Sequence, residues 1–272
     1  MSRPENLPDF RQPPLNEVVL GVQFKPARGY QQIKAGEIWA LYRGDFPNVQ
    51  ELPPVPPMFE TFGPGGMFAS QISFGFVTGA THSRFWFLSP NRDELIQFQQ
   101  DRLLHNWRKV GDQTNEYPRF ERMIVKFENE LRLLEKYFSG LEPQRLEINQ
   151  CEISYINHIL SADSSAPVHV KNWLRFLDFG DQDQPDDFAI TFRSTIRAAD
   201  SKPLGRIITE AATGINQAGR QIITLTLTAR GAPTSADIPA ALDFLKLGRV
   251  LIVTTFANIT TDSAHRQWER VQ

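Results

Sequence analysis

The strongest structural signal in the sequence is a run of apolar side chains at helical spacing between Tyr117 and Phe138. Its members, three or four residues apart, are Phe120, Ile124, Phe127, Leu131, Leu134 and Phe138. This spacing predicts an amphipathic helix that buries one face. Pro118 suits its first turn and Gly140 suits its C-terminal cap. Because the segments around this helix are patterned as strands, we expect it to cover a sheet in an α+β fold.

Strand patterns occur on both sides of the long helix. Before it, the apolar alternation predicts strands within 17–24, 67–77, 84–89 and 94–108, and a short helix within 33–42. After it, we predict strands near 145–159, 188–198, 204–216 and 220–229, a short helix within 168–179, a long helix over 237–258 and a short final helix over 261–271.

The same order of elements occurs twice. Residues 17–140 and 141–272 each read as strand, short helix, three antiparallel strands and long helix. This repetition predicts two similar α+β halves, with the helices packed on one sheet face and a broad surface on the other. An ancient duplication would produce the order, but α+β chains can also resemble each other at this level.

Two proline-rich segments interrupt the pattern. Residues 1–16 contain four prolines and predict an extended arm outside the core. Residues 47–57 end in Pro53-Pro54-Val55-Pro56-Pro57, which we interpret as a stiff, ordered loop.

Composition limits the classes of function. The net charge of −2 gives no global attraction to nucleic acid or anionic lipid. The single cysteine, Cys151, excludes an intramolecular disulfide framework. The start of the chain has no apolar signal region, and no stretch reaches the ~20 apolar residues of a membrane span. We therefore expect a cytoplasmic protein without a membrane partner.

Catalytic motifs are sparse. The five histidines, none of them paired at metal-binding helical spacing, are His82, His105, His158, His169 and His265. The glycine-rich run at 63–66 precedes a predicted strand, whereas a phosphate loop must open a helix. Cys151 and His158 would point to opposite faces of one strand, so we expect Cys151 to be a small core residue. We expect no metal and no cofactor.

One loop concentrates acidic side chains: Asp181, Asp183, Asp186 and Asp187. Their oxygens would suit a hard cation such as Ca²⁺, but the loop lacks the alternating ligand pattern of an EF-hand. A solvated loop is the simpler interpretation.

Residues 95–109 carry an unusual density of hydrogen-bonding groups. Read as one continuous strand, they would place Arg102 and Asn106 on one face and Gln97, Gln99, Asp101 and Trp107 on the other. Such groups need partners if buried and form a recognition surface if exposed. We therefore predict a partner-binding surface made of Gln97, Gln99, Asp101, Arg102, Asn106, Trp107 and Arg108. On this hypothesis, replacing Arg102 and Trp107 weakens binding without unfolding the protein.

The charge of the chain argues against nucleic acid as a partner. Aromatic and basic side chains do mix at 84–87 and 106–109, as in surfaces that stack on unpaired bases. However, neither half of the chain has the excess of basic residues that a nucleic-acid module uses.

Three segments together resemble a known family: Pro13–Phe24, Gln97–Arg108 with its Asn-Trp-Arg end, and Tyr117–Glu121 at the start of the long helix. The resemblance covers essentially the whole chain and is to a family of bacterial and archaeal proteins named for its sporadic distribution and uniform length. No activity is established for that family, so the resemblance implies no catalytic residue. Sporadic distribution is common among mobile defence, toxin–antitoxin and accessory genes, which favours a partner-binding protein.

Two classes of function follow from the sequence. The first is a non-catalytic protein that binds another protein or peptide through its sheet face or an exposed strand edge, with the proline-rich arm as an alternative docking element. The second is an enzyme with scattered carboxylates or histidines in a cleft between the two halves. A closed pocket with perturbed ionisable groups would favour the enzyme, and a polar sheet face would favour binding.

Overall fold

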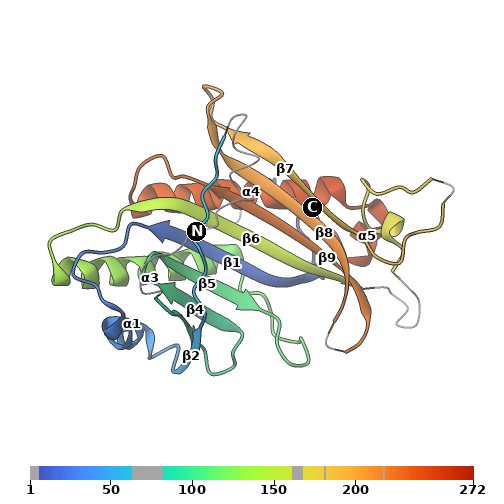
Figure 1. Cartoon of the computed structure of the whole chain (residues 1–272). Helices are drawn as coiled ribbons and strands as arrows, with labels where there is room; N and C mark the ends of the chain where they lie inside the picture. Colours follow the sequence, from blue (N-terminus) through green and yellow to red (C-terminus); the bar gives the residue numbers. More distant parts are fainter. Residues whose placement is uncertain (1–5, 63–81, 161–167, 181, 217) are drawn as a thin grey trace.

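A computed structural model gives the structure of residues 6–62, 82–160, 168–180, 182–216 and 218–272. Within these residues the chain forms one antiparallel sheet of nine strands, in the order β2-β3-β4-β5-β1-β6-β9-β8-β7 (Figure 1). The strands are β1 Leu15–Phe24, β2 Asn48–Leu52, β3 Arg84–Leu88, β4 Glu94–Gln99, β5 Arg102–Arg108, β6 Ile148–Leu160, β7 Ala189–Arg197, β8 Pro203–Ile215 and β9 Gln221–Gly231.

Helices cover one face of this sheet. They are α1 Ala35–Tyr42, α3 Phe120–Leu141, α4 Ile238–Ile259 and α5 Asp262–Gln267, with 3₁₀ turns η1 Gln32–Lys34 and η2 Val170–Asn172. Helix α4 packs on β6 and β9, and α3 contacts both β5 and α4. We call the opposite side of the sheet the helix-free face. No helix in the described part of the chain is long and apolar enough to cross a membrane.

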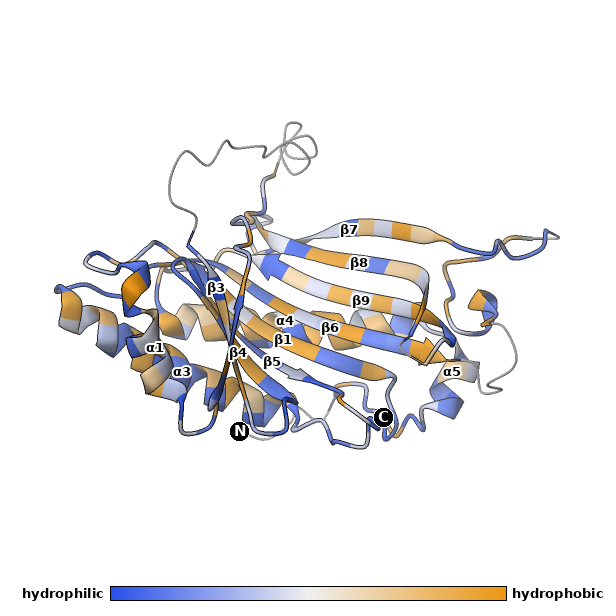
Figure 2. Ribbon diagram, turned by 60° about the horizontal axis from the view of Figure 1, so that its bottom comes forward, coloured by the Kyte–Doolittle hydropathy of each residue, from blue (hydrophilic) through white to orange (hydrophobic). Residues whose placement is uncertain are grey.

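The central pair β1 and β6 joins the two halves. Val18 is paired with Tyr155, Leu20 with Ile153 and Val22 with Cys151, and all these side chains face the helices. Apolar and more polar residues alternate along the strands (Figure 2), and successive residues of a strand lie on opposite faces of the sheet. From this centre the first half continues outward as β5-β4-β3-β2 and the second as β9-β8-β7.

Close packing of α4 depends on a glycine. A Cβ atom on Gly248 would lie 2.6 Å from Cγ2 of Ile153 and 2.9 Å from Cβ of Ala229, which are too close for carbon atoms. The absent side chain therefore lets the middle of α4 rest directly on β6 and β9.

The fold confirms the main sequence predictions. The α+β class is correct, and both long helices lie where the apolar spacing predicted them. Asp237 caps α4 by accepting a hydrogen bond from the Ala240 amide at 2.9 Å, and Thr261 caps α5 in the same way. Cys151 is fully buried, as predicted, and burial raises the pKa of its thiol.

Several predictions of local structure are wrong. Residues 168–179 contain the single turn η2 rather than a helix, and the loop predicted over 47–57 begins with β2. A short apolar run such as Trp173 and Leu174 packs equally well from a turn, so periodicity could not decide. The strand predicted at 67–77 and the glycine run at 63–66 lie outside the described residues.

The described residues 6–14 of the N-terminal arm are not outside the core. Phe10 is 6% exposed and packs edge-on against Phe256 at 5.4 Å between ring centroids. The amide of Asp9 donates to the Gln272 carbonyl, and the amide of Val271 donates back to Asp9. The arm therefore docks on the C-terminus of its own chain.

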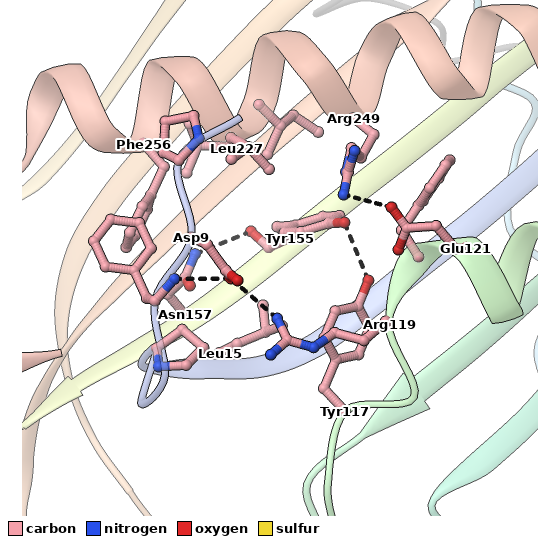
Figure 3. Close-up of a pocket in the computed structure, with 16 residues that line it drawn as sticks. Asp9, Leu15, Tyr117, Arg119, Glu121, Tyr155, Asn157, Leu227, Arg249 and Phe256 are labelled. Atoms are coloured by element: carbon pink, nitrogen blue, oxygen red, sulfur yellow. Dashed lines mark hydrogen bonds and ion pairs between the residues drawn. The ribbon is translucent and has the colours of Figure 1, made fainter. Parts of the chain in front are cut away.

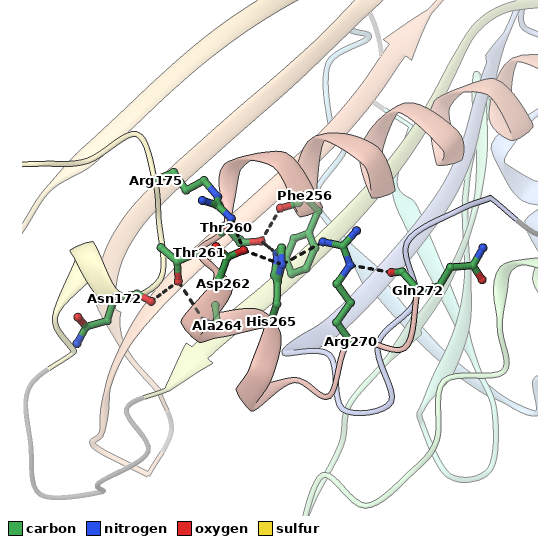
Figure 4. Close-up of polar contacts among 10 residues, drawn as sticks. All are labelled: Asn172, Arg175, Phe256, Thr260, Thr261, Asp262, Ala264, His265, Arg270 and Gln272. Atoms are coloured by element: carbon green, nitrogen blue, oxygen red, sulfur yellow. Dashed lines mark hydrogen bonds and ion pairs between the residues drawn. The ribbon is translucent and has the colours of Figure 1, made fainter.

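A polar cluster fastens the C-terminal segment (Figure 4). His265 is buried, with Nε2 2.8 Å from Oγ1 of Thr260 and Nδ1 3.1 Å from a guanidinium nitrogen of Arg270. Arg175 donates to the Thr260 carbonyl and pairs with Asp262. These contacts hold α5 and the C-terminal tail where the N-terminal arm docks.

Candidate functional site

The predicted site segment is a hairpin rather than one strand. Strand β4 ends at Gln99 and β5 begins at Arg102, and these two residues are direct cross-strand partners. The prediction of a single strand is wrong because residues 100–101 form a tight turn, which changes the assignment of faces. Gln97, Gln99, Arg102 and Asn106 consequently share the helix-free face.

Trp107 lies on the other side of the sheet. Its side chain is 1% exposed and its ring centroid is 5.1 Å from that of Tyr117, next to α3. The expectation that Trp107 belongs to an exposed surface is therefore wrong. Trp107 is a core residue because position 107 follows the register of Leu103 and His105, which also face the helices.

The polar side chains of β4 and β5 form a buried network. The amide of Gln97 accepts hydrogen bonds from Arg84 and Trp86 and donates one to Asn106 at 2.9 Å. Asn106 in turn donates to the Glu17 carboxylate. Burial raises the pKa of Glu17, although the Asn106 hydrogen bond and the charge of Arg108 act in the opposite direction. Apart from Nε of Arg84, which has no hydrogen-bond partner among the described residues, these polar groups find their partners within the chain itself.

Arg108 lies at the border of this network. Its guanidinium stacks on the Trp86 ring at 5.5 Å, and its Nε donates to the Arg92 carbonyl. The partner-binding role predicted for the seven residues of 97–108 stays a prediction, and six of them lie on or beside the helix-free face.

A segment of the chain's own backbone crosses this face. We call residues 53–62, which follow β2, the strap. The side-chain amide of Gln99 accepts from the Val55 amide at 2.9 Å and donates to the Val55 carbonyl at 3.0 Å. Gln23 makes the same pair of contacts with Met58, at 2.9 and 2.5 Å. Two glutamines thus clamp the strap through its main chain.

The row of side chains under the strap continues across the sheet. Arg102 lies between Gln99 and Gln23 in the register and is held by the carboxylate of Asp101 at 3.0 and 3.1 Å. Gln150 follows Gln23 on β6, and its buried Nε2 has no hydrogen-bond partner among the described residues.

The far end of the strap is fixed by charge. The carboxylate of Glu60 lies 3.0 Å from Nε of Arg206 and 3.4 Å from a guanidinium nitrogen of Arg230. The two arginines are direct partners on β8 and β9, and Arg230 also pairs with Glu152. The Phe62 ring packs against the Arg206 guanidinium at 4.9 Å. We call Gln23, Gln99, Arg206 and Arg230 together the strap seat.

A separate cavity of about 70 Å³ lies on the helix side, at the junction of the two halves (Figure 3). Its walls come from the N-terminal arm, the start of α3, the middle of α4 and the central strands. The lining residues are Pro8, Asp9, Phe10, Pro13, Leu15, Tyr117, Arg119, Phe120, Glu121, Tyr155, Asn157, Leu227, Arg249, Ile252, Val253 and Phe256.

The polar groups of the cavity are paired with one another. The hydroxyls of Tyr117 and Tyr155 are 3.1 Å apart, and burial raises both pKa values, so both remain protonated at neutral pH. Arg249, 5% exposed, donates to Glu121 at 2.8 Å. Arrangements of this kind stabilise the junction, whereas a general base would need an accessible ionised acceptor.

Arg119 carries backbone strain at the edge of the cavity. Its φ of 71° and ψ of 148° lie in a region that residues other than glycine rarely adopt. Its guanidinium pairs with Asp9 at 3.1 Å, so the strained residue connects the start of α3 to the N-terminal arm.

Another buried ionisable pair lies beneath α3. Nδ1 of His105 is 2.9 Å from the Glu130 carboxylate, and its Nε2 has no hydrogen-bond partner within the described residues. The side chain of His105 is fully buried and its ring packs edge-on against Phe46. Both side chains of this pair are buried from solvent.

The remaining chemical candidates do not converge. Among the described residues, no group of three His, Cys, Asp or Glu side chains could hold a metal ion. Of the acidic loop, Asp181 lies outside the described part of the chain.

No family model matches the chain, and no curated protein sequence matches it.

Proposed function

We propose that this is a non-catalytic protein-binding protein that takes an extended segment of a partner on its helix-free face. The observation that carries this proposal is the strap itself, which shows how the face holds a chain. Both glutamine clamps contact main-chain groups, and main-chain contacts are available to any extended peptide. A partner segment could therefore replace the strap without a new kind of interaction.

The enzyme hypothesis has one observation in its favour, the cavity at the junction of the halves. Its tyrosines stay neutral and its arginines face carboxylates at 2.8 and 3.1 Å. This pairing accounts for the buried charges without catalysis. We therefore keep the enzyme as the second candidate.

The proposal extends to the origin of the fold. We propose that the halves descend from a duplication, because β5 and β9 flank the central pair at equivalent places and each precedes a long helix. We also propose, from the sequence resemblance alone, membership of the sporadically distributed family and an accessory role in a mobile defence or toxin–antitoxin system.

The test uses a protein that co-purifies in stoichiometric amounts with the tagged chain from its host. Its affinity is measured with both proteins purified, for the wild type and for Glu60→Ala, which removes the charge contact of the strap but leaves the seat intact. We expect Glu60→Ala to tighten the complex, because the strap then competes less. The matched control is Glu116→Ala, an exposed position outside the strap and its seat. Absence of any such protein, or equal affinities in all three chains, would contradict the proposal.

A further inference from the structure

The strap and its seat match each other residue by residue. Gln99 on β4 and Gln23 on β1 lie two strands apart, or about 9.6 Å at the usual spacing between strands. The clamped residues, Val55 and Met58, lie three positions apart. Three residues of a polyproline II helix rise about 9.3 Å. The seat therefore has the repeat of one turn of such a helix.

The prolines of the strap complete this match. Both residues between the clamped positions are prolines, Pro56 and Pro57, and proline has no N–H group to leave unsatisfied. Proline also fixes its own φ and restricts the residue before it to extended conformations. The only residues of 53–58 with an amide proton are thus the two that the glutamines clamp.

Besides clamping two main-chain positions, the strap seat also binds an acidic side chain. Without an acidic side chain at position 60, Arg206 would keep only its hydrogen bond to the Thr61 carbonyl, and Glu152 would be the one printed carboxylate partner left to Arg230 among the described residues. The side chains of these arginines are 17% and 14% exposed, and an unpaired charge at such burial is costly. An occupant of the seat therefore needs a carboxylate five residues after the first clamped residue.

The apolar side chains of the strap contribute little to recognition. Met58 and Phe59 are 47% and 51% exposed, so the seat does not select them. What the seat selects is the spacing of two main-chain amides, the prolines between them and the acidic side chain that follows.

Building on the proposed function, we propose that the partner segment is a proline-rich extended peptide of the form x-Pro-Pro-x-x-acidic, and that the strap is the internal occupant of the same seat. Because the strap is tethered, it acts at an effective concentration of order mM, and a free peptide has to compete with it. Removing Glu60 weakens the strap and leaves both arginines for the carboxylate of an incoming peptide.

The experiment follows the fluorescence anisotropy of a labelled synthetic peptide with the sequence of residues 52–62. We expect it to bind the Glu60→Ala protein at least about tenfold more tightly than the wild type, the range of one charge-assisted contact. Peptides carrying Glu60→Gln, or glycine at Pro56 and Pro57, should lose most of this gain. Adding Gln99→Ala to the Glu60→Ala protein should weaken binding, while adding Gln267→Ala on α5 should not.

Equal affinity for the two proteins, or equal affinity of the acidic and Glu60→Gln peptides, would overturn the inference. The outcome is separable from that of the proposed function. If a natural partner binds the Glu60→Ala protein more tightly than the wild type but the peptide binds both equally, only the proposed peptide sequence is wrong. If the peptide binds as expected but the natural partner has equal affinity for the Glu60→Ala protein and the wild type, the proposed function is wrong. The peptide specificity of the strap seat then still holds.

Discussion

Trp107 shows how one side chain ties the site segment to the core. It shares strand β5 with Arg102 and Asn106, yet it points to the helices while they point to the helix-free face. Substitutions at the helix-facing positions of this strand therefore affect the core, whereas substitutions at the alternate positions affect the helix-free face. Measurements of the free energy of unfolding distinguish these two sets of positions.

Trp107→Ala should lower the free energy of unfolding by about 3–5 kcal/mol, the usual cost of removing a buried aromatic side chain. Trp86→Ala, on the half-buried helix-free face, should cost clearly less. Urea denaturation of both variants measures the difference. Equal losses would mean that Trp107 is not a core residue.

The sequence predicted the polarity of this region but not its geometry. The alternation of polar residues in 94–108 is real, but the turn at 100–101 has neither glycine nor proline, and Asp101 alone was a weak turn signal. Gln23, Glu60, Arg206 and Arg230 were missed because they are far apart in the chain and meet only through strand order. The proline run was the one signal that could have pointed to the strap.

At the scale of elements, the contact of α4 with the sheet depends on Gly248. Gly248→Ala gains about 1 kcal/mol of helix propensity but places a methyl group against Ile153 and Ala229, and such overpacking costs about 1–3 kcal/mol. Because Ala229 is on a central strand and cannot move aside, we expect net destabilisation.

Gly140→Ala is the matched control for this prediction. A Cβ at Gly140 in α3 would meet nothing within 4 Å, so this variant should gain stability. Thermal unfolding of the two variants should therefore shift in opposite directions. A stabilised Gly248→Ala protein would contradict the packing of α4.

The C-terminal cluster should respond to pH. Burial, and then the charges of Arg270 and Arg175, lowers the pKa of His265 below its ordinary value of about 6.5. The unfolded chain therefore takes up this proton first as the pH falls, and stability should decline below about pH 6.5. Protonation would place a hydrogen on Nδ1, which faces Arg270.

Unfolding free energies measured from pH 7.5 to pH 5.5 check this prediction. The His265→Gln variant should show a shallower decline over the same range than the wild type. Hydrogen exchange should locate the loss of protection in α5 and the docked arm. An identical pH slope in the two proteins would contradict the assignment.

For the whole molecule, the β1–β6 pair makes the two halves one sheet. Neither half keeps its central strand paired on both sides when the other unfolds. We expect β5 and β9 amides to exchange at the same free energy in native-state hydrogen exchange with added denaturant. Exchange of one half at a clearly lower free energy would show that the halves are independent domains.

The order of elements predicted from the sequence, two series of strands each followed by a long helix, matches this architecture in broad terms. The joining of both series into one sheet could not be predicted, because pairing between β1 and β6 is a contact across more than 120 residues. The strap seat also depends on this joining, because its residues come from strands of both halves.

Displacement of the strap by a peptide is tested most directly by a distance measurement between two spin labels. The labels are attached at Phe59→Cys on the strap and Leu133→Cys on α3, both exposed positions. Cys151 is buried, so it should not compete for the label. With an excess of the peptide of residues 52–62, we expect the distance distribution to shift to longer values as the strap leaves its seat. An unchanged distribution at saturating peptide would contradict it.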